Sequence, residues 1–337
     1  MPSVSIIIPC YNEQDTIYKL LEAIYTQTFP RTDLEVVISD GMSSDGTQAE
    51  IVAFSDSHPD MHISVVKNPT RNIAAALNRA IKETHGEIII RLDAHSIPYP
   101  DYIERSVTDL EVGLGENVGG IWEIHPGAQT WVAQSIAVAA SHRLGVGDAL
   151  YRHTENAALV DTVPFGAFRR ELLALIGFFD ESLLTNEDYE FNARIRKSGG
   201  KVWLDPSIRS VYISRPTLAK LAKQYARYGF WKWRMLRRYP ETLRWRQVLP
   251  PLFVLSLCVG AGLAIFLPIF RVLLVVEIFV YLIVLVAAGV QAAMRQKKIY
   301  LVIGLPLAIA TMHITWGAGF LWSMIKEIFT VRNLEKK

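Results

Sequence analysis

The chain has 337 residues, with 35 Lys and Arg against 33 Asp and Glu, so its net charge is +2. This length accommodates one large domain or two smaller ones, and the near-neutral charge argues against a general nucleic-acid-binding protein. The only cysteines are Cys10 and Cys258. A disulfide framework is therefore not expected, and a reduced, cytoplasmic setting fits. No charged and apolar leader precedes the first apolar run at Val4, so we expect no signal peptide.

The first 92 residues alternate between short apolar runs and segments with helical spacing of apolar residues. The runs predict strands over 4–8, 34–38, 62–66 and 87–92, and the spacing predicts helices over 13–27, 47–54 and 72–84. Alternating strands and helices with short links predict an α/β fold with a mostly parallel sheet. In such sheets ligands bind beyond the carboxyl ends of the strands.

The pattern is less regular after Pro98. We predict strands over 118–124 and 201–204, a return to the sheet over 161–168, an amphipathic helix over 129–143, a helix beginning at Arg169 and Arg170, and a further helix opening with the acidic cluster 185–190. Together these elements predict a catalytic domain over residues 1–214.

Polar segments follow three of the predicted strands: 9–13, 40–46 and 91–95. Because the carboxyl ends of parallel strands share one edge of a sheet, these segments outline a binding site, which we interpret as a nucleotide-sugar site. Asp40 ends the second strand, where its carboxylate can accept hydrogen bonds from a pyrimidine or a ribose. For Asp45, at the start of the next helix, we favour the simpler role of an N-cap.

Asp93 and His95 are the candidate metal ligands. Two side chains at positions i and i+2 of an extended turn can face the same divalent cation, and a carboxylate with an imidazole suits Mn²⁺ or Mg²⁺. The alternative is that His95 only caps the turn before Pro98. We favour metal binding because the segment follows a strand.

Asp188 is the candidate general base, with Glu187 beside it. Adjacent residues of a helix point about 100° apart, so one carboxylate can face an acceptor hydroxyl while the other holds its surroundings. The alternative is a solvated helix start, since acidic residues there complement the helix dipole.

The C-terminal third indicates a membrane protein. A basic and aromatic segment over 215–247 predicts a helix lying on an anionic leaflet rather than a nucleic-acid-binding strip. Three apolar spans over 248–325 predict transmembrane helices, and a tail over 326–337 follows. Positive charges before the first span and after the second place those segments in the cytoplasm. Three crossings would then put the C-terminus outside, against which the basic tail argues.

These motifs, taken together, resemble the inverting family-2 glycosyltransferases, whose catalytic domain has the GT-A fold. The resemblance covers about residues 4–229 and rests on Pro9-Cys10-Tyr11-Asn12-Glu13, Asp40-Gly41-Met42-Ser43-Ser44-Asp45-Gly46-Thr47, Arg91-Leu92-Asp93-Ala94-His95 and Asn186-Glu187-Asp188-Tyr189-Glu190. It implies that Pro9, Glu13, Asp40 and Asp93 contact the nucleotide and that Asp188 is the base. It also implies a metal ligand at position 95, where this chain has His and the family usually has Asp.

The resemblance leads to a fuller set of site residues. The expected donor-binding residues are Pro9, Tyr11, Asn12, Glu13, Asp40, Arg71, Asp93 and Gly166. A second motif, Gln224-Tyr225-Ala226-Arg227-Tyr228, resembles the Gln-x-x-Arg-Trp motif of processive synthases, with Tyr228 in place of Trp. It places Gln224, Arg227 and Tyr228 near the acceptor and the leaving diphosphate; the alternative is that Arg227 faces lipid headgroups.

The Asp-Ala-His variant with three apolar spans is similar to succinoglycan-type glucosyltransferases of exopolysaccharide assembly. The resemblance implies a multi-pass inner-membrane enzyme, with its catalytic domain in the cytoplasm, that moves one sugar from a UDP-sugar to a polyprenyl-diphosphate-linked saccharide. Membrane lipids and other glycan-assembly enzymes are the further expected partners. Alternatives are transfer to polyprenyl phosphate itself, a processive synthase, and a non-catalytic nucleotide-sugar-binding scaffold. A small transporter would leave the soluble half unexplained.

Overall fold

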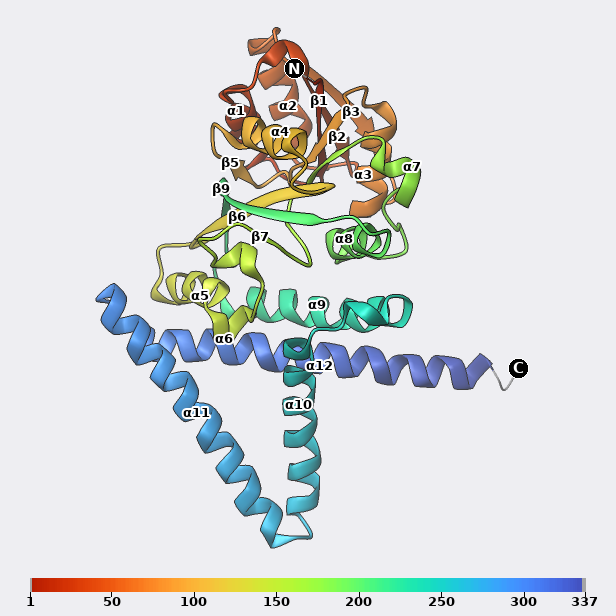
Figure 1. The fold of residues 1–337 in the computed structure, drawn as a ribbon. Coiled ribbons are helices and arrows are strands. Elements are labelled where there is room, and N and C mark those ends of the chain that lie inside the picture. The colour runs from red at the N-terminus through yellow and green to blue at the C-terminus, as the bar shows by residue number, and fades with distance from the viewer. Residues whose placement is uncertain (1, 335–337) are drawn as a thin grey trace. The chain divides into compact units, whose positions relative to one another are not determined.

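The computed structural model describes residues 2–334, and the chain forms two compact units (Figure 1). The first unit contains the residues up to Glu123 together with Leu150–Tyr212. The second contains Ile124–Ala149 and the residues from Ile213 onward. The first unit ends at Tyr212 and lacks the segment 124–149, whereas the catalytic domain predicted over 1–214 includes that segment.

The first unit is built on a nine-stranded sheet with the order β3-β2-β1-β4-β8-β6-β9-β5, in which β7 also pairs with β9. Its strands are β1 (Val4–Cys10), β2 (Leu34–Asp40), β3 (His62–Lys67), β4 (Ile88–Arg91), β5 (Ile97–Pro98), β6 (Asn117–His125), β7 (Ala158–Leu159), β8 (Ala167–Arg169) and β9 (Val202–Ile213). Strands β3, β2, β1 and β4 are parallel, and β8 adds to β4 in the antiparallel direction. The parallel half confirms the predicted α/β fold.

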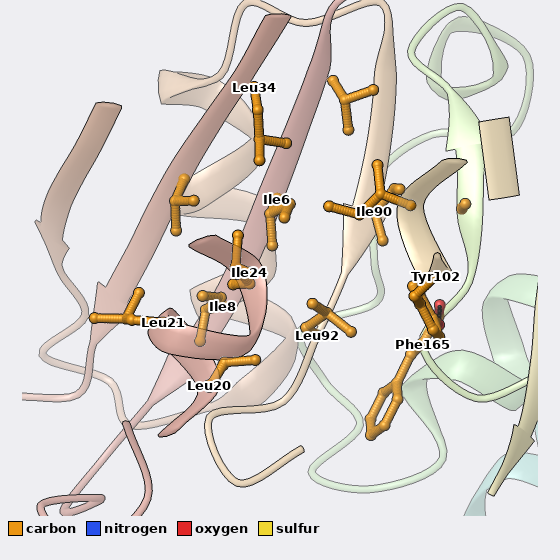
Figure 2. Close-up of a cluster of buried hydrophobic side chains, with 14 of the residues drawn as sticks. Ile6, Ile8, Leu20, Leu21, Ile24, Leu34, Ile90, Leu92, Tyr102 and Phe165 are labelled. Carbon is orange, nitrogen blue, oxygen red and sulfur yellow. Dashed lines mark hydrogen bonds between the residues drawn. The ribbon is translucent and has the colours of Figure 1, made fainter. Parts of the chain in front are cut away.

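Helices cover both faces of this sheet because side chains of each strand alternate between them. The helices of the first unit are α1 (Ile17–Tyr25), η1 (Arg31–Asp33), α2 (Thr47–Ser57), α3 (Ile73–Glu83), α4 (Tyr102–Val112), η2 (Leu150–Arg152), α7 (Leu172–Ile176) and α8 (Glu187–Lys197). Ile6 and Ile8 point into a cluster with Leu20 and Leu21 of α1 and with Tyr102 of α4 (Figure 2). The intervening strand residue, Ile7, packs on the other face with Leu77 of α3 and Phe191 of α8.

The structure corrects the prediction at Arg169 and Arg170. Arg169 is the last residue of β8, where it pairs with Ile88 of β4, and the helix begins only at Leu172. Arg170 continues this pairing, since its backbone nitrogen donates a hydrogen bond of 2.9 Å to the carbonyl oxygen of Glu87, and its Nε donates one of 2.8 Å to the carbonyl oxygen of Gly86. Helix α4 was not predicted, and the predicted strand over 201–204 extends to Ile213.

The second unit is helical apart from the ends of β6 and β9. Its helices are α5 (Trp131–Ser141), α6 (Arg143–Val146), α9 (Leu218–Arg238), η3 (Pro240–Thr242), α10 (Trp245–Ala264), α11 (Pro268–Gln296) and α12 (Leu301–Leu334). Among the described helices, α10, α11 and α12 are long and apolar enough to cross a membrane. The predicted interfacial segment contains α9. The predicted tail continues α12 as far as Leu334, and residues 335–337 lie outside the described part.

The segment 124–149 belongs to the second unit because α5 contributes to that unit's core. Ile136 and Ala139 of α5 are fully buried with Leu301 and Ile309 of α12 and with Leu221 of α9. The amphipathic helix that we predicted here is therefore correct. Its apolar side, however, packs on α12 and α9 rather than on the sheet.

Candidate active site

The loops after β1 and β3 carry half of the predicted donor-binding residues, and Asp40 ends β2. Each of the loops after β1, β2 and β3 holds a residue in the left-handed backbone conformation. These residues are Asn12, Met42 and Arg71, with φ values of 54°, 60° and 53°. Such a conformation costs a non-glycine residue free energy and is found preferentially at functional sites. Its repetition at three neighbouring strand ends agrees with a ligand site at this edge of the sheet.

Asp40 holds the loop that follows it. Its carboxylate accepts hydrogen bonds from the backbone nitrogen of Ser43 (3.1 Å), from the Ser43 hydroxyl (2.6 Å) and from Gln48 Nε2 (2.6 Å), and the residue is 1% exposed. Asn12 joins the same loop, since its Oδ1 accepts a hydrogen bond of 2.9 Å from the backbone nitrogen of Ser44. Asp40 and Asn12 thus shape the loop that follows β2, and their direct contact with a nucleotide remains a prediction.

Asp45 and Pro9 complete this edge of the sheet. The Asp45 carboxylate accepts hydrogen bonds from the backbone nitrogen of Thr47 (3.0 Å) and from its hydroxyl (2.5 Å), at the first residue of α2. Asp45 therefore stabilises the helix start, but the N-cap residue of α2 is Gly46 and not Asp45 as predicted. Pro9 pairs in register with Ser39 of β2, one residue before the end of β1.

Tyr11 and Arg71 lie against each other. The Arg71 guanidinium stands 4.8 Å from the centre of the Tyr11 ring, and Arg71 Nε donates a hydrogen bond of 3.2 Å to the carbonyl oxygen of Gly41. The Tyr11 side of this pair remains accessible, since the residue is 41% exposed. An aromatic face held by a cation offers a surface on which a planar base can stack.

Arg91, the last residue of β4, gathers three carboxylates. Its Nη2 lies 2.9 Å from Asp93 Oδ1 and 2.9 Å from Glu187 Oε1, and its Nη1 donates to Asp188 Oδ1. Burial alone would lower the pKa of the Arg91 guanidinium, but the surrounding carboxylates outweigh burial and raise it. The cluster consequently has one cation among three acidic groups, and it joins the end of β4 to the start of α8.

This cluster sets the proton affinity of Asp188. Burial, together with the charges of Glu187 and Asp93, raises the pKa of the Asp188 carboxyl to about 7, against the opposing attraction of Arg91. A general base works best with a pKa near the operating pH. Asp188 therefore has the property that its predicted role requires.

The remaining residues of the acidic segment fix α8 in place. Glu190 is fully buried and forms an ion pair with Arg194 one turn later, with 2.5 Å between Glu190 Oε1 and Arg194 Nε. Arg194 in turn donates to the carbonyl oxygens of Ile176 and Phe178. The Tyr189 hydroxyl donates a hydrogen bond of 2.9 Å to Asp161. These contacts leave Glu187 and Asp188 as the acidic pair of α8 that lies on Arg91.

His95 contacts the first loop, because its Nδ1 lies 3.0 Å from Glu13 Oε1. Within residues 2–334, no group of three or more His, Cys, Asp and Glu side chains is arranged to hold a metal ion. Asp93 and His95 nevertheless fit a divalent cation of the kind that takes one or two protein ligands and completes its shell with substrate phosphates and water. The metal remains a prediction that depends on the bound donor.

Gly166 and the Gln224–Tyr228 motif have local structural roles. A Cβ atom on Gly166 would collide with the Asn117 amide, and the Gly166 carbonyl oxygen accepts a hydrogen bond of 3.1 Å from the Arg91 backbone. In α9, Gln224 Nε2 donates to the Tyr228 hydroxyl at 2.9 Å, one turn away. Arg227 lies on the same helix. The predicted contacts of these residues with donor or diphosphate remain untested.

The sequence did not predict a role for Arg91, although this residue opens the motif over 91–95. A usable signal was present. A charged residue at the end of the apolar run 88–90 is almost never buried without ionic partners. Such a position calls for carboxylates elsewhere in the chain, and the segment 185–190 supplies them.

Comparison with known proteins gives consistent matches. The family described as glycosyl transferase family 2 matches residues 5–176. The succinoglycan biosynthesis protein ExoA of Rhizobium meliloti is 32% identical over 318 residues, covering 94% of this chain and 93% of that protein. A dolichyl N-acetyl-α-D-glucosaminyl phosphate 3-β-D-2,3-diacetamido-2,3-dideoxy-β-D-glucuronosyltransferase of Methanococcus voltae is 27% identical over 332 residues, covering 97% and 98% of the two chains.

The fold also matches a solved structure. Mannosyltransferase PcManGT from Pyrobaculum calidifontis, in complex with GDP-Man and Mn²⁺, aligns with a TM-score of 0.65 and 22% identity, covering 95% of this chain and 87% of that chain. This likeness shows that the first unit has a GT-A-like fold. The family match ends at residue 176, so Glu187 and Asp188 lie beyond it.

Proposed function

Because the chain belongs to glycosyl transferase family 2, we propose that it is an inverting enzyme that transfers one sugar from a UDP-sugar to a saccharide linked to a polyprenyl diphosphate. The observation that carries this proposal is the gathering of Asp93, Glu187 and Asp188 on the buried Arg91. It joins the strand end expected to bind the donor to the helix that bears a carboxylate with a raised pKa. A protein that only binds a nucleotide sugar has no need of such a base.

In the proposed reaction Asp188 takes the proton of the acceptor hydroxyl. The acceptor oxygen then forms a bond to the anomeric carbon as the bond to the donor diphosphate breaks, which inverts the configuration at that carbon. Arg91 keeps Asp188 oriented, and Glu187 shares the charge of Arg91. Asp93 and His95 would hold a Mn²⁺ or Mg²⁺ ion, which neutralises charge on the departing diphosphate.

The relatives support a lipid-linked acceptor. The name of the Methanococcus voltae relative specifies a dolichyl phosphate sugar as its acceptor, and the Rhizobium meliloti relative belongs to succinoglycan biosynthesis. We extend this class of acceptor to the present chain, with the reaction at the cytoplasmic face of the inner membrane. The candidate membrane helices support that location.

The experiment uses the full chain purified in detergent, Mn²⁺, labelled UDP-sugars and a bacterial lipid extract, and it measures label in the lipid phase. The test variant is Asp188→Asn. The matched control is Asp101→Asn, which changes the N-cap residue of α4, a carboxylate outside the site. We expect label with the unchanged protein and with Asp101→Asn, and a rate lower by about 10²–10⁴-fold with Asp188→Asn.

Other outcomes would identify the alternatives. Equal label with Asp188→Asn would show that Asp188 is not the base. It would favour polyprenyl phosphate as the acceptor, because that acceptor is already anionic and needs no base. Products longer than one sugar unit would indicate a processive synthase. UDP-sugar binding without any label, for every donor, would favour a binding scaffold.

A further inference from the structure

Helices α9 and α12 of the second unit lie side by side along most of α9 (Figure 1). Near its middle, the two backbones approach so closely that a Cβ atom on Gly229 would collide with the carbonyl of Trp316, and one on Gly319 with that of Ala226. Further along, Trp233 Nε1 donates a hydrogen bond of 2.8 Å to Glu327. The two helices must therefore have the same orientation relative to a membrane.

Helix α9 is too highly charged to cross a bilayer. It carries seven cationic side chains, namely Lys220, Lys223, Arg227, Lys232, Arg234, Arg237 and Arg238. Each Lys or Arg at the centre of a membrane helix costs about 2.5–3.5 kcal/mol on insertion scales. A helix of this composition lies on an anionic surface instead. Because the second half of α12 packs alongside α9, it must also lie along the membrane surface rather than cross the bilayer.

The first half of α12 has a partner that is too short to cross. Gly304 packs on Ser135 of α5, and His313 Nε2 lies 2.7 Å from the carbonyl oxygen of Leu144 in α6. Helix α5 has 11 residues and α6 has four, whereas a crossing helix needs about 20. Both halves of α12 are thus packed against helices that do not span a membrane.

Helices α10 and α11 have a different relationship to α12. Pro250, near the start of α10, packs on Gly317, and Gly289, in the last third of α11, packs on Leu301 and Val302. From these contacts α10 and α11 extend away on the same side of α12 and meet at the loop 265–267 (Figure 1). With 20 residues, α10 is about 30 Å long, which matches the hydrocarbon thickness of a bilayer.

We propose that α10 and α11 cross the bilayer as a hairpin and that α12 lies in the plane of the cytoplasmic leaflet beside α9. The partner of this α9–α12 surface is an anionic lipid leaflet. Exposed apolar side chains lie within an arc of about 120° on α12: Ile303, Leu307, Ile314, Trp322, Ile325, Ile328 and Phe329. This stripe enters the acyl region while the exposed cations of α9 bind the lipid phosphates; Lys232 is buried and is not among them.

Two crossings place the C-terminus on the side from which α10 starts. Most of the positive charges near the ends of α10 and α11 then lie on one side of the membrane, as they usually do on the cytoplasmic side, and Arg271, near the hairpin tip, lies on the other. These charges are Arg244 before α10, Arg246 in its first turn, Arg295 in the last turn of α11, and Lys297 and Lys298 after it, and Lys326 of α12 lies on the same side. This arrangement removes the conflict between three crossings and a basic tail. It replaces the third predicted transmembrane helix with an in-plane helix.

The first test measures depth in vesicles that contain phosphatidylglycerol. Single cysteines at Ile303, Ile314 and Ile325 are introduced into a Cys258→Ala background, in which Cys10 is buried, and are spin-labelled. We expect all three positions to have the same shallow depth. Labels along α11 provide the control. Those at Val272 and Val286 should lie at a shallow depth in the bilayer, and the label at Phe279, between them, should lie deep. A maximum of depth at Ile314 would overturn the proposal.

The second test determines the side of the membrane. Lys326→Cys and, at the hairpin tip, Phe266→Cys are treated with a membrane-impermeant maleimide in spheroplasts and in inverted vesicles. We expect Lys326→Cys to be labelled in inverted vesicles and Phe266→Cys in spheroplasts. Labelling of both from the same side would show three crossings. Neither test depends on catalytic activity, so the proposed function and this topology can fail separately.

Discussion

The guanidinium of Arg91, at the end of β4, donates a hydrogen bond of 2.9 Å to the carboxylate of Glu187, at the first residue of α8. These residues are separated by 96 positions in the chain. Their contact ties the helix that carries the candidate base to the strand that precedes Asp93. Both side chains are largely buried; removal of Arg91 would leave the carboxylates without their cation, whereas removal of Glu187 would still leave Arg91 paired with Asp93 and Asp188.

Replacement of Arg91 should therefore destabilise the first unit strongly. We expect Arg91→Met to reduce the free energy of unfolding by about 3–5 kcal/mol, as for other broken buried ion pairs, and thermal unfolding at pH 7.5 measures the loss. The control is Arg31→Met, which breaks the exposed pair between Arg31 and Asp60 and should cost about 0–1 kcal/mol. Equal losses for the two variants would mean that the ion pairs of Arg91 stabilise the first unit no more than an exposed ion pair does.

The raised pKa of Asp188 predicts the pH dependence of activity. A general base must be ionised, so the rate should fall about tenfold per pH unit below a pKa of about 7. An ordinary aspartate, with a pKa near 3.9, would show no such fall between pH 8 and pH 5.5. Initial rates over that range, at saturating donor, measure the effect. A flat profile would contradict the assignment of the base to Asp188.

Much of this site was predictable from the sequence because its residues lie next to strong local signals. Asp40 and Asp93 follow apolar strands, and Asp188 opens a helix in an acidic segment. Periodicity locates all three, and parallel topology brings the strand ends together. The four parallel strands and the helices between them were predictable for the same reason, since each is amphipathic or apolar within a short window.

Features that depend on distant contacts were not predictable in this way. Segment 124–149 looks like part of the α/β domain by position, and only its packing with Leu301 and Ile309 assigns it to the second unit. The sequence predicted that a helix begins at Arg169 and Arg170, but pairing with β4 extends strand β8 to Arg169. In α12, hydropathy indicates a span, while the contacts with α9 and α5 support an in-plane position.

Asp109 should make the first unit less stable at neutral pH. Burial, together with the charge of Asp205 and a hydrogen bond to it, raises the pKa of the Asp109 carboxyl to about 6, and the buried Asp109 Oδ2 has no hydrogen-bond partner within residues 2–334. Between about pH 4 and about pH 6 the folded state therefore keeps a proton on Asp109, whereas the unfolded state, with a pKa near 3.9, has lost it. Stability therefore falls as the pH rises from about 4 to about 6, and the loss is complete above that range.

Asp109→Asn should remove this loss. At pH 7.5 we expect the variant to be more stable by about 1–2 kcal/mol, or several degrees in Tm, with a smaller gain at pH 4.5. The control is Asp101→Asn at the N-cap of the same helix, where Arg105 already pairs with the carboxylate. That variant should show no gain at either pH. A gain from Asp109→Asn that is equal at both pH values would rule out titration as its cause.

The close approach of α9 and α12 predicts opposite effects for two glycine substitutions in helices. Alanine favours a helix over glycine by about 0.5–1 kcal/mol, so Gly262→Ala in α10, where no atom lies within 4 Å of the added Cβ, should be neutral or stabilising. At Gly229 the added Cβ would meet the backbone of Trp316, which cannot move without separating the helices. Gly229→Ala should consequently lower the melting temperature of the detergent-purified protein, measured by tryptophan fluorescence. If both variants raise it, the two helices do not pack through Gly229.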